Sequence, residues 1–130
     1  MRTILSVALA AAFVGLGAGI ALAQSSEPAK VGESEKGKTL VDAKGMTLYI
    51  YDRDTAAGKS SCNGQCATNW PPLMASADAK DAGTWTVIIR DDGGKQWAYK
   101  GKPLYFWKDD KKAGDAAGDG RNNVWHIAAP

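Results

Sequence analysis

Apolar and polar residues alternate over short runs of this chain, which is the pattern of half-buried β-strands. The clearest run is residues 84–90 (TWTVIIR), followed by the hairpin signal at residues 91–94 (DDGG) and a returning run at residues 95–99. Further runs lie at residues 38–43, 46–51, 102–107 and 123–128. About six strands, little helix and frequent turns together indicate an all-β fold.

One stretch of the chain occurs twice. Residues 45–58 (GMTLYIYDRDTAAG) and 101–114 (GKPLYFWKDDKKAG) align without a gap, from Gly45 with Gly101 to Gly58 with Gly114. A constant offset indicates an internal duplication. We therefore expect two similar antiparallel β-units, at about residues 38–74 and 94–130, connected by long loops with little helix. Each unit alone is too small to be stable, so the two are expected to pack together.

The repeated strand has two apolar faces. In each copy, aliphatic or phenyl side chains alternate with aromatic rings: Leu48 and Ile50 against Tyr49 and Tyr51, and Leu104 and Phe106 against Tyr105 and Trp107. Strands of this kind are usually covered on both sides. We expect packing of the two units to bury the aliphatic face of each.

The first residues predict export. Arg2 precedes an uncharged stretch from Ile4 to Leu22, and residues 21–23 (ALA) form a small-x-small cleavage site. This layout is that of a secretory signal peptide, residues 1–23, so the mature chain is expected to have no stable membrane anchor. An uncleaved anchor is the alternative, since the stretch is just long enough to span a bilayer. The mature protein is then periplasmic or secreted.

Composition indicates one domain and excludes two classes of partner. Residues 24–37 are polar and charged, so we expect a disordered leader there, followed by a single β-domain at residues 38–130. Without Arg2, the chain has 15 basic and 14 acidic residues and a formal charge of +1. This balance gives no long-range attraction to nucleic acid or to an anionic membrane.

The two cysteines, Cys62 and Cys66, lie in the connection between the copies. In an oxidising exported compartment, an intramolecular disulfide is the default. A redox-active pair and a metal site are the alternatives. The spacing is C-x3-C rather than the C-x-x-C of thioredoxin-like motifs, and no cluster rich in Cys or His lies nearby. The spacing and the compartment favour a structural disulfide.

The repeated stretch carries the motif Y-x-(F/W/Y)-x-x-D in both copies, formed by Tyr49, Tyr51 and Asp54 and by Tyr105, Trp107 and Asp110. With the intervening cysteines and residues 70–72 (WPP), the chain resembles the secreted-repeat family of predicted bacterial lipoproteins with this motif. The resemblance covers residues 39–128 and implies an exported repeat protein of unknown function. The residue directly after the predicted cleavage site is Gln24 and not a cysteine, so lipid attachment is not expected.

The aromatic residues allow two interpretations. Four of them are candidates for a platform that stacks on a sugar, a quinone or another flat ligand: Tyr51, Trp70, Trp107 and Trp125. Alternatively, the aromatic face builds a second small core beneath the long loops. Their spacing along strands favours packing.

Asp54 and Asp110 each follow a predicted strand by a few residues. An aspartate at this position commonly caps a turn by accepting backbone N–H groups. A pair of Ca²⁺-binding loops is the alternative, although EF-hand spacing is missing from the sequence. We expect turn capping at both positions and predict no cofactor.

The single histidine, His126, and the methionines Met46 and Met74 are weak candidates for copper ligands. They are the basis of an alternative function, redox or copper handling in the periplasm. A single histidine on a strand is more often structural, so we predict no metal site. The sequence also lacks the nucleophile elbow, the phosphate loop and the dinucleotide fingerprint. We therefore expect a non-catalytic binding or interaction module of the cell envelope, with an envelope protein or a small ligand as its partner.

Overall fold

A computed structural model of the protein describes residues 27–130. The predicted signal peptide and the first three residues of the predicted leader lie outside this range. The elements, in chain order, are β1 (Lys30–Ser34), β2 (Gly37–Val41), β3 (Tyr49–Tyr51), α1 (Gln65–Asn69), β4 (Trp85–Ile89), β5 (Lys95–Tyr99), β6 (Lys102–Pro103), a 3₁₀ helix η2 (Arg121–Asn123) and β7 (Trp125–Ile127). Every strand pair is antiparallel, and among the described residues α1 is the one α-helix.

This mostly-β architecture confirms the expected fold class. The strands expected at residues 46–51 and 102–107 are shorter than predicted, and isolated bridges at Thr47 and Tyr105 extend the pairing of β3 and β6. No helix among residues 27–130 has the length and apolar character needed to cross a membrane.

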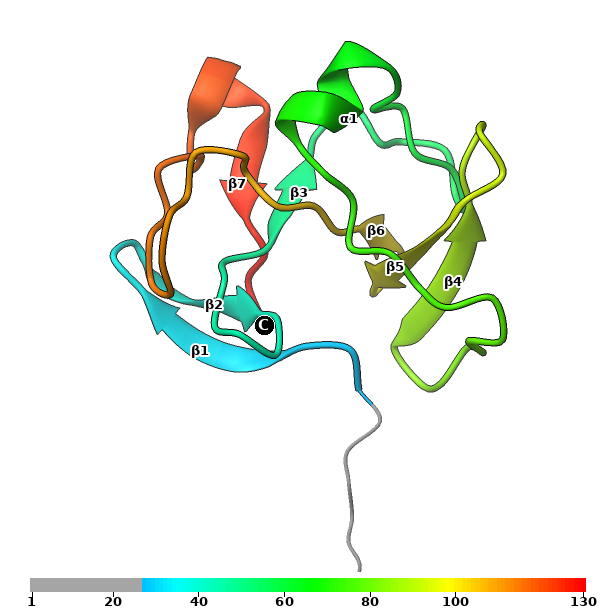
Figure 1. Ribbon diagram of the computed structural model, residues 1–130, viewed down its shortest axis with the longest axis horizontal. Coiled ribbons are helices and arrows are strands. Elements are labelled where there is room, and N and C mark those ends of the chain that lie inside the picture. The colour runs from blue at the N-terminus through cyan, green and yellow to red at the C-terminus, as the bar shows by residue number, and fades with distance from the viewer. Residues whose placement is uncertain (1–26) are drawn as a thin grey trace, which may run out of the picture.

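Two antiparallel hairpins occupy equivalent places in the two halves, β1–β2 in the first and β4–β5 in the second. Figure 1 shows them on opposite sides of the central strands. The expectation of a disordered leader is wrong for residues 30–37, which form β1, the turn after it and the first residue of β2. Their polar side chains face solvent, while their backbone pairs with β2. The strand packs closely, because a Cβ on Gly32 would lie 2.7 Å from Val41 Cγ2.

Each half of the chain completes the sheet of the other half. Strand β3 of the first half pairs with β7 of the second, with Tyr51 opposite Trp125. Conversely, the segment after β6 pairs with residues 69–73, where Phe106 N–H donates to the Pro71 carbonyl at 2.7 Å. At the centre Tyr49 and Tyr105 exchange both backbone hydrogen bonds, at 2.8 and 3.0 Å. This reciprocal pattern is that of a two-fold arrangement of the halves.

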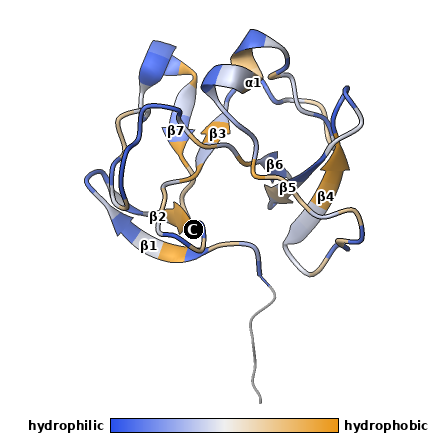
Figure 2. Ribbon diagram, viewed as in Figure 1, coloured by the Kyte–Doolittle hydropathy of each residue, from blue (hydrophilic) through white to orange (hydrophobic). Residues whose placement is uncertain are grey.

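The aliphatic face of the repeated strands forms the main core. Its buried members come from both halves and include Leu40, Leu48, Leu73, Trp85 and Leu104. Figure 2 shows hydrophobic stretches in β2, β3 and β4, the strands that contribute Leu40, Ile50 and Trp85 to this core. The expected alternation is confirmed, since Leu48 and Leu104 belong to this core whereas Tyr49 and Tyr105 lie in a separate cluster.

The aromatic face forms a second buried cluster beneath the long loops: Tyr49, Cys62, Trp70, Tyr105, Trp107 and Trp125. Gly118 fits against this cluster because it has no side chain. A Cβ at this position would lie 2.8 Å from Trp70 Cη2 and 3.0 Å from Trp107 Cβ. The backbone of the loop that contains Gly118 therefore packs directly against the indole rings.

Leu48→Ala and Leu104→Ala should destabilise the protein to a similar extent. Both side chains are fully buried, and each truncation leaves a cavity, so we expect a loss of about 2–5 kcal/mol for either variant. Urea unfolding gives the two values. Ile89→Ala, at a side chain that is 52% exposed, is the control and should change stability by about 0.5 kcal/mol or less. A large cost at one leucine alone would contradict the equivalence of the halves.

Gly118→Ala should destabilise the protein by about 1–3 kcal/mol, because the added methyl group overpacks the indole cluster. The backbone of Gly118 lies outside the left-handed region, so steric contact is the cause that the variant tests. Thermal unfolding, followed by near-UV circular dichroism, reports both the stability and the packing of the indoles. The neighbouring exposed Ala117→Ser is the control, and an equal loss there would show that the effect is not one of packing.

Candidate functional site

The tyrosine and aspartate of the repeated motif bind each other across the two halves. The Tyr49 hydroxyl donates to Asp110 Oδ2 at 2.6 Å, and the Tyr105 hydroxyl donates to Asp54 Oδ2 at 2.5 Å. Hydrogen bonds from hydroxyl groups to carboxylates are short and roughly twice as strong as neutral ones. We call these the tyrosine–aspartate pairs. Each pair joins the strand of one half to the turn of the other.

The second oxygen of each carboxylate accepts a backbone N–H. Asp54 Oδ1 binds the Ser61 amide at 2.6 Å, and Asp110 Oδ1 binds the Ala117 amide at 2.9 Å. Ser61 and Ala117 occupy equivalent positions in the two copies of the sequence repeat. Both aspartates thus accept loop N–H groups, as turn capping requires. Their tyrosine partners were not predicted from the sequence, although Tyr and Asp recur together in both copies of the motif.

Burial dominates the protonation of the pairs. It raises the pKa of the Tyr49 and Tyr105 hydroxyls well above the ordinary phenol value of 10.0, and the hydrogen bond to a carboxylate raises both pKa values further. Burial also raises the pKa of Asp54, against the opposing effect of hydrogen bonds from Tyr105 and Ser61. The folded protein therefore retains the phenolic protons of Tyr49 and Tyr105 at alkaline pH.

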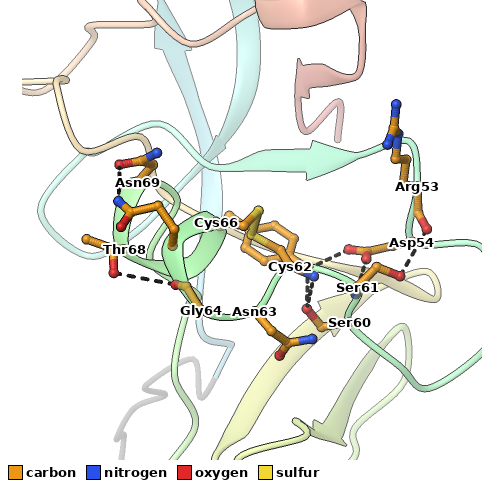
Figure 3. The surroundings of a disulfide bond; sticks show 12 residues. Arg53, Asp54, Ser60, Ser61, Cys62, Asn63, Gly64, Cys66, Thr68 and Asn69 are labelled. Atoms are coloured by element: carbon orange, nitrogen blue, oxygen red, sulfur yellow. Dashed lines mark hydrogen bonds between the residues drawn. A yellow bond between two sulfur atoms is a disulfide. The ribbon is translucent and has the colours of Figure 1, made fainter.

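Cys62 and Cys66 form a disulfide, which confirms the expected pairing. Figure 3 shows the bond at the start of α1, where the Cys62 amide donates to Ser60 Oγ at 3.1 Å. Ser60 Oγ in turn lies 2.7 Å from the Tyr105 hydroxyl. The disulfide loop is thus continuous with one tyrosine–aspartate pair.

A buried arginine anchors the same loop to the second half of the chain. Arg90 is 3% exposed, and its guanidinium donates to the Cys62 carbonyl at 2.6 Å, to Gln96 Oε1 at 2.7 Å and to Ser60 Oγ at 3.1 Å. Gln96 itself donates to the Leu104 carbonyl at 2.8 Å. A buried charge of this kind requires such a set of acceptors. Arg90 could not be singled out from the sequence, because a lone arginine at the end of a strand forms no recognisable pattern.

Beside the aromatic cluster lies a groove of about 360 Å³, which we call the motif groove. Its lining combines aromatic edges with polar side chains and the disulfide: Tyr51, Arg53, Cys66, Asn69, Trp70, Asn122, Val124 and Trp125. Three of the four residues that the sequence analysis proposed for a flat ligand therefore lie here. Trp107, the fourth, lies in the buried cluster outside the groove lining.

Several polar groups of the motif groove have no partner among residues 27–130. The Tyr51 hydroxyl, the Arg53 guanidinium and the Asn122 amide make no hydrogen bond or ion pair with the described part of the chain. Figure 3 shows the Arg53 side chain turned away from the disulfide loop. Asn122 has a left-handed backbone, with φ of 51°, and such strain in a non-glycine residue is concentrated at functional sites.

A larger groove, of about 410 Å³, lies between residues 27–28 and 76–82 and includes Trp85 and Trp97. It contains no residue of the repeated motif. Its carboxylates are already engaged, since Asp78 accepts the Ser76 hydroxyl at 2.8 Å and Asp81 accepts the Val87 amide at 2.8 Å. The motif groove, with its unpaired polar groups, is the better candidate for a binding site.

The weak metal candidates occupy separate local environments. His126 Nε2 lies 2.8 Å from Asp52 Oδ2, in a pair whose side chains are both partly exposed. The Met46 amide donates to Asp42 Oδ1, and the Met74 side chain is exposed. In residues 27–130, no group of three or more His, Cys, Asp or Glu side chains is arranged to hold a metal ion.

Replacing Tyr49 and Tyr105 together by Phe should make the unfolding free energy of the protein less dependent on pH in the alkaline range. Because folding raises the pKa of both phenols, the unfolded chain releases these protons first, and stability falls as pH rises through about 10. The double variant should show a shallower fall of the unfolding free energy above this pH, measured by urea unfolding at a series of pH values. Leu48→Ala destabilises without removing a phenol and should keep the wild-type slope. An unchanged slope in the double variant would contradict the assignment.

The repeated architecture agrees with a comparison of the chain with protein families. The model of a family described as a secreted repeat of unknown function matches residues 30–74 and 86–129. These two matches begin at equivalent positions of the two copies and cover β1–β2 and, from its second residue on, β4–β5, so each repeat starts earlier than residues 38 and 94. No curated protein and no solved structure matches the chain. Two copies of the family's unit cover most of the sequence, and the chain belongs to this family of secreted repeats.

Proposed function

We propose that this protein is a non-catalytic binding module of the cell envelope, periplasmic or secreted, that holds a small ligand in the motif groove. The observation that carries the proposal is the set of unpaired polar groups of Tyr51, Arg53 and Asn122 around the edges of buried indole rings. A pocket with an aromatic wall and a few convergent polar groups is the usual form of a small-molecule site.

The chemistry of the groove indicates the class of ligand. Arg53 supplies a charged donor suited to a carboxylate or a phosphate, because a guanidinium binds such groups through two parallel hydrogen bonds. The Tyr51 ring and the edges of Trp70 and Trp125 suit a flat or ring-shaped body. We therefore expect an anionic ligand with a ring, such as a carboxylated saccharide or an aromatic acid.

The rigidity of the surroundings supports binding. Cys66 and Trp70 lie on the disulfide-linked segment, and Trp125 lies on a strand paired to Tyr51. Side chains on such elements lose little freedom when a ligand binds, which lowers the entropic cost of association. The hydroxyl protons of the tyrosine–aspartate pairs stay within the fold and do not take part in ligand binding. In this proposal, the pairs stabilise the structure around the motif groove.

A titration followed by amide chemical shifts tests this proposal. Carboxylated saccharides and aromatic acids are compared with their neutral amides. We expect shifts at residues 51–53, 66–70 and 122–125 with the anionic probes. Arg53→Ala should weaken that binding about tenfold or more, since it removes a charge-assisted contact. Lys36→Ala, in the exposed β1–β2 turn, is the matched control for charge.

Two results would count against the motif groove. The first is a set of shifts on another surface, for example around Trp85 and Trp97, with the motif groove unchanged. The second is an equal loss of affinity in Arg53→Ala and Lys36→Ala, which would show general charge attraction without a defined site.

A further inference from the structure

Three buried indole rings and one half-buried phenol ring form a continuous stack. The ring centroids of Tyr51 and Trp125 are 4.1 Å apart, those of Trp125 and Trp70 are 3.8 Å apart, and those of Trp70 and Trp107 are 4.3 Å apart. The first two contacts are nearly parallel, with interplanar angles of 12° and 3°. The rings alternate between the two halves of the chain. We call these four residues the aromatic stack.

The aromatic stack makes edge contacts with both tyrosine–aspartate pairs. The Tyr49 ring lies 5.4 Å from the Trp70 ring, and the Tyr105 ring lies 5.2 Å from the Trp125 ring, both in edge-to-face geometry. Packing alone accounts for a buried aromatic cluster. Packing alone does not explain a second feature. Each of the two central indoles contacts a phenol, and each of these phenols donates to a carboxylate.

Indole and phenol rings are among the side chains that lose a single electron most easily. A phenol that loses an electron becomes a strong acid, so its oxidation needs a nearby proton acceptor. Asp110 Oδ2 at 2.6 Å from Tyr49 and Asp54 Oδ2 at 2.5 Å from Tyr105 are such acceptors. The proton can cross either hydrogen bond without any movement of the heavier atoms.

Charges around the stack favour the phenols as the final site of oxidation. The Arg121 guanidinium lies 4.5 Å from the Trp107 ring centroid and the Lys108 ammonium lies 5.3 Å from it, so a positive charge on this indole is disfavoured. Trp107 Nε1 is buried without a hydrogen-bond partner among the described residues, so it has no acceptor for its own proton. The two carboxylates lie instead beside the tyrosines.

The motif groove gives an oxidant access to the stack. Tyr51 is half-buried, and it lines the groove together with the edges of Trp70 and Trp125. An electron can therefore leave from a ring at the surface and be replaced from a tyrosine inside the fold.

We propose that the aromatic stack and the tyrosine–aspartate pairs form a one-electron relay that quenches oxygen-derived radicals. The radical takes an electron from an indole or phenol at the groove and a proton from solvent, which completes its X–H bond. Tyr49 or Tyr105 then supplies an electron to the oxidised ring and passes its hydroxyl proton to Asp110 or Asp54. The products are X–H, a neutral tyrosyl radical and a protonated aspartate.

The relay is reset by a one-electron reductant of the thiol or ascorbate class. The reductant returns an electron to the tyrosyl radical, and the aspartate returns the proton to the tyrosine oxygen. The original phenol and carboxylate are thereby restored. The relay does not depend on a ligand in the groove, so it stands or falls separately from the proposed binding function.

Flash photolysis with a photogenerated ruthenium(III) tris-bipyridine oxidant tests the relay on the intact mature protein. We expect a tryptophan radical that converts to a tyrosyl radical in a step independent of protein concentration and slowed in heavy water. In the Tyr49→Phe/Tyr105→Phe double variant, the tryptophan radical should survive roughly tenfold longer or more. Tyr99→Phe, whose ring packs against Trp85 in the other core, is the matched control and should behave as the wild type.

The single variants Tyr49→Phe and Tyr105→Phe keep the test valid if the double variant does not fold. Each retains one pair and should keep a tyrosyl product with a lower yield, while near-UV circular dichroism verifies the packing of the indoles. Equal lifetimes of the tryptophan radical in wild-type protein and in the folded variants would overturn the proposal. An equal rate of radical conversion in heavy and light water would also overturn it. That result would mean that no proton moves in this step and that the tyrosine–aspartate hydrogen bonds are purely structural.

Discussion

The reciprocal bonding of Tyr49 and Tyr105 is the constraint on which the rest of the molecule depends. These two residues exchange backbone hydrogen bonds at the centre of the fold, and each side chain reaches the aspartate of the opposite half. The exchange fixes the register of both strands, because a slip by one residue would place the tyrosines in the aliphatic core. The separation into two cores, and the closure of both loops over the aromatic one, follow from this register.

Burial makes that constraint strong as well as specific. A phenol or a carboxylate that is taken out of water must find a partner, and loss of one partner leaves the other unsatisfied. In this protein each tyrosine hydroxyl of the aromatic core binds a carboxylate of the opposite half, so these polar groups stabilise the association of the halves. Arg90 follows the same rule, since it lies after β4 and binds the Cys62 carbonyl of the first half.

The repeat, the faces of its strands and the disulfide could be predicted from the sequence, because each depends on local spacing. The alternation of Leu48 and Tyr49 is visible in the chain itself, and so is the constant offset between the two copies. The hairpin strand at residues 30–34 could not be recognised by its composition, because its side chains are polar and its stability comes from backbone pairing with β2.

The tyrosine–aspartate partners across the two halves also could not be predicted from the sequence. Nothing in the motif says whether Tyr49 meets Asp54 of its own copy or Asp110 of the other, since both lie at the same place in the pattern. The choice depends on how the two copies pack. The motif groove could likewise be predicted only in part. The sequence pattern indicated Tyr51, Trp70 and Trp125 but gave no reason to include Arg53 or Asn122.

The exchange of strands between the halves has a consequence for the origin of the chain. A single repeat would leave its own tyrosine strand without a neighbour, so an ancestor of half the length would be complete only as a homodimer. Fusion of two such copies replaces a bimolecular encounter by an intramolecular one, at an effective concentration set by the connection between the copies. Fusion also releases the copies from symmetry. The two copies differ in the present chain: the first contains the disulfide, whereas the second has Gly118 at the position equivalent to Cys62 and cations over Trp107.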